Sequence, residues 1–177
     1  MAGTMTRDRI MQRREFLNAG LLGAAGLGLF GLANFSFGAA TARAKGKFEI
    51  TKTDAQWKQQ LTADQYYVLR QEGTERPFTS PLNKEKRAGT FVCAGCQLPL
   101  FSSKTKYESG TGWPSFYAPL PRAVGTSTDR LLGYPRTEVH CRRCGGHLGH
   151  VFEDGPKPTG LRYCMNGDAM LFRPSAT

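Results

Sequence analysis

The sequence predicts a mainly β domain of antiparallel strands, preceded by short helices and held together by a zinc ion. Three observations predict it: two helix-capping patterns between residues 53 and 65, short apolar runs cut by Gly and Pro beyond about residue 88, and two Cys-x2-Cys pairs. The chain has 177 residues, of which 40% are hydrophobic and 21% charged. This composition suits one globular domain and excludes a disordered, collagen-like or multi-span membrane protein.

Residues 1–44 differ in composition from the rest and predict an export signal. The pair Arg13-Arg14 precedes an uncharged run, residues 16–42, that is rich in Gly, Ala, Leu and Phe, and Ala42-Arg43-Ala44 is a small-x-small cleavage pattern. The segment resembles a twin-arginine signal, which directs folded proteins to the twin-arginine export machinery of bacteria. We expect cleavage after Ala44 and a periplasmic or exported protein. An uncleaved N-terminal anchor facing the periplasm is the alternative, because the run exceeds the roughly 20 residues that a span needs.

Residues 45–177 form the predicted domain, which carries 19 Lys+Arg against 12 Asp+Glu and thus a formal charge of +7. The basic residues are spread along the chain, and no aromatic-interleaved basic stripe is present. We therefore expect a solvated surface without a nucleic-acid partner, and a monomer.

Two short helices are predicted at the start of this domain. Thr53 to Gln56 and Thr62 to Gln65 both fit the capping box, in which a Thr hydroxyl and a Gln amide bond to free N–H groups of the first turn. The first helix would bury Trp57 and Leu61, and Gly73 is placed to end the second. We expect the helices to cover one side of the β core.

Beyond residue 88 the sequence changes to short apolar or alternating runs between turn residues, the pattern of antiparallel strands. The expected strands are residues 90–92, 98–101, 137–140, 147–152, 161–164 and 170–172.

Four of the five cysteines form two knuckles, Cys93-Ala94-Gly95-Cys96 and Cys141-Arg142-Arg143-Cys144. Each knuckle can place two sulfurs at adjacent corners of a tetrahedron, about 2.3 Å from a zinc ion. The 44 residues between the knuckles exceed the usual ribbon spacing, so the fold must bring two distant turns together. A redox pair or a disulfide is the alternative for each knuckle alone. A second alternative is a local site of Cys141, Cys144, His147 and His150.

Cys164 is the odd cysteine, and an unpaired thiol in an exported protein requires a reason. It lies in the segment Pro158–Asn166, and two other segments, Gly110–Phe116 and His147–Phe152, complete an ordered set of motifs with the two knuckles. Together these motifs resemble the B-type peptide methionine sulfoxide reductases, which act on the R epimer of the sulfoxide. The resemblance covers roughly residues 50 to 173.

The resemblance implies two antiparallel sheets and repair of oxidised proteins that carry methionine-R-sulfoxide, with Cys164 as the nucleophile. It also implies a structural zinc ion held by Cys93, Cys96, Cys141 and Cys144. Around the substrate it implies His147, His150, Asn166 and Trp113.

Thiolate attack on a sulfoxide needs a reactive thiol, a proton donor and an apolar slot for the methyl group. Arg162 shares a strand face with Cys164, where its charge would favour the thiolate. Phe116 is expected beside Trp113 in the substrate wall, although either ring is also a candidate core anchor. His147 and His150 are three residues apart, so a regular strand would separate them; we expect a turn at Gly149, or different roles with His150 nearer the chemistry.

Many members of the family have a second cysteine at the position of Thr111, and this chain has none there. A sulfenic acid on Cys164 would therefore react with an external thiol, from a thioredoxin-like or other reductant. Two other function classes compete with this prediction: a zinc-ribbon nucleic-acid module, and a thiol-disulfide oxidoreductase that works through its knuckles.

Overall fold

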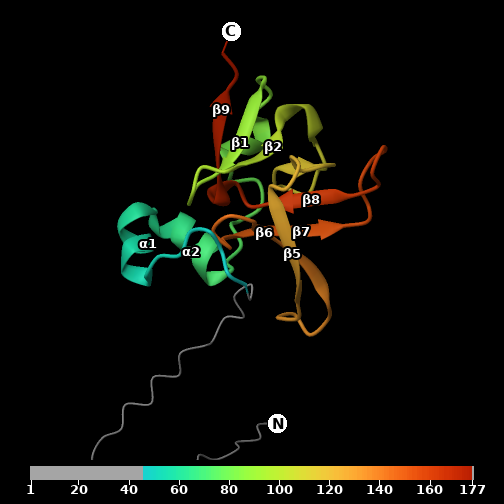
Figure 1. The fold of residues 1–177 in the computed structure, drawn as a ribbon. Helices are drawn as coiled ribbons and strands as arrows, with labels where there is room; N and C mark the ends of the chain where they lie inside the picture. Colours follow the sequence, from blue (N-terminus) through green and yellow to red (C-terminus); the bar gives the residue numbers. More distant parts are fainter. Residues whose placement is uncertain (1–45, 177) are drawn as a thin grey trace, which may run out of the picture. The chain divides into compact units, whose positions relative to one another are not determined.

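The computed structural model describes residues 46–176. The predicted export signal, residues 1–44, lies outside the described residues (Figure 1). Among the residues that are described, no helix has the length and apolar character needed to cross a membrane.

Both predicted capping boxes are present, and each starts a helix. Thr53 caps α1 (Asp54–Gln60), and Thr62 caps α2 (Ala63–Gln71), each with the expected reciprocal Gln bond. The second helix ends differently from the prediction, because the left-handed residue is Glu72, with φ 58°, and not Gly73. Gly73 is instead a point of close approach, since a Cβ there would lie 2.3 Å from the ring of Tyr67.

Two antiparallel sheets follow the helices, as predicted (Figure 1). The smaller has the strand order β2-β1-β9, and the larger has the order β3-β4-β8-β7-β6-β5. The strands are β1 (Gly89–Cys93), β2 (Pro99–Ser102), β3 (Lys106–Tyr107), β4 (Ser115–Phe116), β5 (Val124–Asp129), β6 (Arg136–Cys141), β7 (His147–Phe152), β8 (Arg162–Met165) and β9 (Met170–Pro174). Short 3-10 helices lie at η1 (Pro81–Lys84), η2 (Ser103–Thr105) and η3 (Gly167–Ala169).

The hydrophobic core lies between the two sheets and is rich in aromatic rings. Phe116 on β4 stacks on Phe101 of β2 at a centroid distance of 4.4 Å and meets the edge of Phe91 on β1 at 4.9 Å. All three side chains are fully buried. Because β4 pairs with β8, this packing supports the strand that carries Cys164.

The helices pack over the two cysteine turns as well as over the sheet. The Gln60 amide donates to the Gly95 carbonyl at 2.5 Å, and the Arg70 guanidinium donates to the Cys144 carbonyl at 3.1 Å. Leu69 lies against Gly146, where a Cβ would meet its methyl group at 2.9 Å. The buried face of the helices therefore fixes the position of both knuckles.

Candidate active site and metal site

The two knuckles meet in space and bring their four sulfur atoms together. All four Sγ atoms of Cys93, Cys96, Cys141 and Cys144 lie within 4.8 Å of one another. Sγ atoms are 3.8 Å apart for Cys93 and Cys144 and 3.5 Å apart for Cys96 and Cys141. A tetrahedral ion with bonds of about 2.3 Å to sulfur requires sulfur separations of about 3.8 Å. The four-cysteine cluster therefore has the size and donor set of a metal site.

The alternative ligand set that combined two cysteines with two histidines is wrong. The described residues form a single group of three or more potential ligands, and it contains neither His147 nor His150. All five cysteines, which lie within the described part of the chain, are free rather than joined in disulfides.

Cys164 lies on β8 and opens into a cavity of about 130 Å³. It pairs with Ser115 on one side and with His150 on the other, so the three side chains stand in one row across the sheet. The cavity wall includes Cys164, His150, Trp113, Asn166, Arg136 and Phe152. Five of these six residues belong to the three motifs, so the fold brings three separate segments of the sequence together at one small cavity.

The surroundings of the Cys164 thiol act on its pKa in opposite directions. Burial raises the pKa and is the largest effect, while the Thr111 hydroxyl and the Arg162 charge lower it. The Thr111 Oγ1 lies 3.8 Å from Cys164 Sγ, so position 111 is within reach of the thiol. Arg162 is itself held by Asp154 through two bonds of 2.9 and 2.8 Å. The net pKa is above the ordinary value, so the resting cysteine is mainly a thiol at neutral pH.

A bulge in the β6–β7 ladder brings the two histidines of the motif to the same side. Val139 pairs with Gly149 but His140 pairs with His147, so Leu148 is the extra residue on β7. Gly149 is required here, because a Cβ would lie 2.1 Å from the Cys164 carbonyl oxygen. The rings of His147 and His150 are 5.4 Å apart between centroids, and His150 is the one that lines the cavity.

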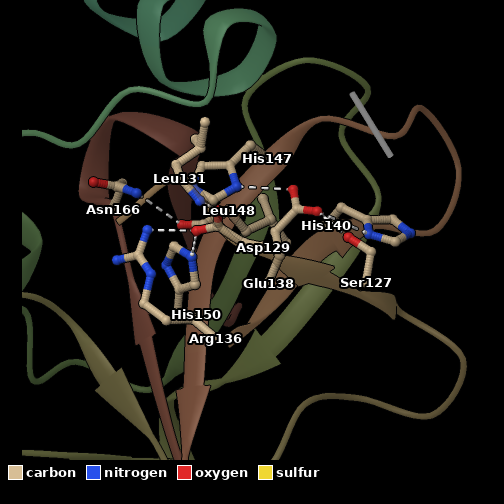
Figure 2. Close-up of polar contacts among 10 residues, drawn as sticks. All are labelled: Ser127, Asp129, Leu131, Arg136, Glu138, His140, His147, Leu148, His150 and Asn166. Carbon is tan, nitrogen blue, oxygen red and sulfur yellow. Dashed lines mark hydrogen bonds and ion pairs between the residues drawn. The ribbon is translucent and has the colours of Figure 1, made fainter. Parts of the chain in front are cut away.

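His147 and His150 are each held by a carboxylate from another strand, Glu138 from the adjacent β6 and Asp129 from β5, the next strand beyond it (Figure 2). Glu138 Oε1 lies 2.9 Å from His147 Nδ1, and Asp129 Oδ2 lies 2.8 Å from His150 Nε2. Arg136 also pairs with Asp129. These contacts form a polar network behind the cavity wall.

The network also sets the protonation of its members. Burial raises the pKa of Asp129, but its bonds from Leu131, His150 and Arg136 outweigh burial and bring the pKa to about 2. Burial lowers the pKa of His150, and Asp129 opposes the change only in part. At neutral pH, Asp129 is therefore ionised and His150 is neutral, so His150 Nε2 carries a proton that it donates to Asp129.

Asn166 and Trp113 are fixed by the loop that follows α2. The Asn166 amide oxygen accepts from the Glu75 N–H at 3.0 Å, and its nitrogen donates to the Leu148 carbonyl at 3.1 Å. Trp113 donates from Nε1 to the Glu75 carbonyl at 3.1 Å. The Glu75 carboxylate accepts from the N–H groups of Gly167 and Asp168 at 2.7 and 2.9 Å. Glu75 therefore ties two opposite walls of the cavity together.

Known proteins are similar in sequence to most of the described domain. The SelR domain model matches residues 61–174. The chain belongs to the MsrB family of peptide methionine sulfoxide reductases. A relative from Agrobacterium fabrum, "Peptide methionine sulfoxide reductase MsrB", is 54% identical over 127 residues, covering 71% of this chain and 94% of that protein. Relatives with the same name are 55% identical over 127 residues in Leptospira interrogans (71% of this chain, 97% of theirs) and 53% over 125 in Methanosarcina barkeri (70% and 88%).

One residue expected in the substrate wall of this MsrB-type protein lies elsewhere. Phe116 is fully buried between the two sheets and stacks on Phe101, so its ring does not reach the cavity. The aromatic side chain beside Trp113 in the cavity wall is instead Phe152, which Arg162 covers at 4.5 Å. Phe116 is therefore a core anchor, which was the alternative expected for it.

Sequence reasoning missed four polar residues of the site: Glu75, Asp129, Arg136 and Glu138. None belongs to the three motifs, and each reaches the site through cross-strand pairing or a loop. A signal was present for two of them, because Arg136 and Glu138 alternate on one face of a strand that ends at Cys141 of the four-cysteine cluster. Glu138 is buried and Arg136 is half-buried, and charged residues at such positions need partners.

Proposed function

We propose that this MsrB-type protein reduces protein-bound methionine-R-sulfoxide to methionine, with Cys164 as the attacking nucleophile. Free methionine-R-sulfoxide is a second candidate substrate. The main support is that Cys164, outside the four-cysteine cluster, shares one small cavity with His150 and Trp113. The indole and Phe152 would receive the methyl group, and Asn166 would bind the polar end of the sulfoxide.

The proposed reaction transfers one oxygen atom. The Cys164 sulfur attacks the sulfoxide sulfur, the S–O bond of the substrate breaks, and Cys164 ends as a sulfenic acid. Two electrons pass from the cysteine to the sulfoxide sulfur, which becomes a thioether. The proton of the thiol ends on the sulfenic oxygen, so the step balances without another reactant.

His150 is the residue best placed to move that proton. Because Nε2 donates to Asp129, the free acceptor of the neutral ring is Nδ1. This nitrogen would accept the proton of the Cys164 thiol, whose raised pKa requires a base, and return it to the sulfoxide oxygen. His147 would hold the His150 ring in place through their edge contact.

An external thiol would regenerate the enzyme. With the other four cysteines assigned to the cluster, the thiol of a thioredoxin-like reductant would attack the sulfenic acid and release water. A second external thiol would then break the mixed disulfide and restore Cys164. Thr111 occupies the position from which a second thiol of the chain would reach Cys164 Sγ.

The four-cysteine cluster fits a structural zinc ion. Four thiolates match the ligands that zinc prefers in closed structural sites, and the sulfur separations match the tetrahedron. When bound, zinc would join the turn after β1 to the turn after β6.

We further propose that the protein works in the periplasm after twin-arginine export, an inference supported by Arg13-Arg14, the uncharged run and Ala42-Arg43-Ala44. Cell fractionation of the full chain and of an Arg13→Lys/Arg14→Lys variant tests it. The variant should stay in the cytoplasm, and equal distribution of both chains would contradict the proposal.

The activity is tested by supplying the R and S epimers separately to the purified full chain with dithiothreitol as the only reductant. We expect turnover of the R epimer alone, since the cavity places the thiol and the methyl slot on fixed sides of the sulfur. Turnover of the S epimer, or of neither epimer by a zinc-loaded folded chain, would overturn the proposal.

A further inference from the structure

The tip of the β5–β6 hairpin exposes three large apolar side chains within four residues. Leu131, Leu132 and Tyr134 are 58%, 59% and 55% exposed, in contrast to core residues of the same size such as Leu100 and Phe101, which are fully buried. Gly133 adopts φ 82°, and its N–H donates to the Arg130 carbonyl at 3.0 Å, which closes the loop. Single exposed apolar residues are common, but a contiguous group marks a binding surface.

This apolar tip is directly connected to the active-site cavity. The Leu131 N–H donates to Asp129 at 2.8 Å, and the same carboxylate binds His150 in the cavity wall (Figure 2). At the other end of the loop, Arg136 lines the cavity and pairs with Asp129. The tip therefore follows Asp129, which binds the wall residue His150, and precedes Arg136, which lines the cavity itself.

A second exposed aromatic side chain lies beside the Trp113 wall. Phe78 is 72% exposed and is held at φ 65°, a conformation that costs energy for a residue with a side chain. Its N–H donates to the Gly112 carbonyl at 2.7 Å, one residue before Trp113. Apolar groups thus flank the cavity next to both His150 and Trp113.

The cavity can hold only a small part of a peptide substrate. At about 130 Å³ it accommodates roughly one side chain, so the residues on either side of an oxidised methionine must lie outside it. Those residues would contact the surface beside the cavity mouth. Because methionine is mostly a core residue, other residues of the core face lie within a few positions of it in the sequence and become exposed when oxidation or unfolding opens the core.

We propose that Leu131, Leu132 and Tyr134, together with Phe78 near Trp113, bind the apolar residues that flank methionine-R-sulfoxide in an unfolded polypeptide. This inference rests on the proposed function and deepens it by naming the substrate class. The hairpin makes the protein selective for damaged, unfolded chains over the free amino acid. The apolar contacts add affinity that the cavity does not supply.

The test compares three substrates with dithiothreitol as reductant and the full chain as enzyme. They are N-acetyl-methionine-R-sulfoxide, a peptide with the sulfoxide between leucines, and the same peptide with serines. In the variant Leu131→Ser/Leu132→Ser/Tyr134→Ser, kcat/KM for the leucine peptide should fall about tenfold, which equals about 1.4 kcal/mol. The other two substrates should change less than twofold. Leu171→Ser is the matched control, because Leu171 is an exposed apolar residue on the smaller sheet. It should leave kcat/KM for all three substrates unchanged.

Equal losses on all three substrates would mean that the hairpin supports the cavity, and unchanged kinetics would mean that it binds no substrate. A dimer that the variant abolishes in sedimentation would assign the tip to a second copy of the chain. A loss seen only with a protein reductant would assign it to the electron donor. Each of these results overturns the proposal. Failure of the unmodified chain to reduce N-acetyl-methionine-R-sulfoxide would instead reject the proposed function itself.

Discussion

The four-cysteine cluster and Cys164 are two thiol sites whose surroundings are built in different ways. In the cluster, each pair of sulfurs comes from one tight turn, and the sulfurs are one another's nearest polar neighbours. At Cys164, the neighbours come from separate segments: Thr111 from a loop, Arg162 from the same strand and His150 from the next strand. The cluster is therefore built from one local structure, the Cys-x2-Cys turn, that occurs twice, whereas the surroundings of Cys164 depend on strand register.

This difference suits the two roles that we propose for cysteine thiols in this chain. Four sulfurs at tetrahedral spacing suit a metal ion that has no open position for a substrate. A single thiol that borders a cavity, with a neutral histidine opposite it, suits chemistry on a substrate. Changes in the two regions should therefore separate stability from activity.

The largest effect is expected for loss of a cluster sulfur. Cys141→Ser should prevent zinc binding and destabilise the domain by more than about 5 kcal/mol, since structural zinc contributes folding free energy directly. Zinc content by elemental analysis and Tm check this. Strong chelators should have the same effect on the unmodified chain, and a metal-free variant with an unchanged Tm would contradict the structural role.

Replacing Cys164 should abolish activity without lowering stability. Cys164→Ser should lower turnover by at least about a thousandfold, because the alcohol is a far weaker nucleophile, while zinc content and Tm stay as they are. Turnover of the R epimer and elemental analysis on the same sample measure both. Residual activity close to that of the unmodified chain would remove Cys164 from the mechanism.

A change in the network behind the cavity should give an intermediate effect. Asp129→Asn removes the charge that holds His150 and Arg136, and we expect kcat/KM to fall about 10- to 100-fold. Because Asp129 raises the pKa of His150, its loss should also move the acidic limb of the pH profile to lower pH. Glu49→Gln is the matched control, since its pairing with Arg142 is at the surface. Equal effects of both variants would mean that Asp129 has no special role.

The pH dependence should follow the raised pKa of Cys164. Single-turnover rates should rise with pH in two steps, first as His150 becomes neutral and can take the proton of the thiol, and then as Cys164 itself ionises. The midpoint of the second step should lie above the range of an ordinary thiol, because burial raises the pKa of Cys164. Arg162 lowers that pKa, so Arg162→Met should move the midpoint further up. The rate at neutral pH should fall about tenfold for each pH unit by which the midpoint rises. A midpoint that moves down in the variant would contradict this interpretation of the electrostatics.

The smallest effect on activity is expected for Phe116→Leu. The ring packs between the sheets and not in the cavity, so the change should lower the free energy of unfolding by about 1–2 kcal/mol. At 25 °C kcat/KM should stay within twofold. A large rise in KM with unchanged stability would mean that Phe116 contacts the substrate.

Local signals predicted most of the fold. Thr53 and Thr62 form caps with side chains three residues away, and strands β1, β2, β6, β7, β8 and β9 have clear apolar runs. Strand β5, by contrast, has the sequence Val-Gly-Thr-Ser-Thr-Asp, which shows no apolar alternation. It lies at the edge of the larger sheet, where fewer of its side chains need to be apolar. Strands β3 and β4 have two residues each and exist because of their partners.

In the candidate site, too, some features follow from local sequence and others depend on strand pairing. The knuckles and the position of Cys164 follow from spacing and from the motifs of the family. The bulge at Leu148, which unites His147 with His150, arises from pairing with β6. The contacts of Asp129 and Glu75 depend equally on segments distant in the sequence. Such residues become functional only through register and packing, which a single sequence does not specify.

The central claim is that Cys164 is the reactive thiol, whereas the other four cysteines are held in a cluster. A single turnover without reductant tests this claim most directly. The zinc-loaded full chain is mixed with excess methionine-R-sulfoxide and a sulfenic-acid trap, and methionine and the labelled residue are measured. We predict one methionine per chain, a label on Cys164 alone and no loss of zinc. A label or disulfide at Cys93, Cys96, Cys141 or Cys144, with zinc released, would contradict the account.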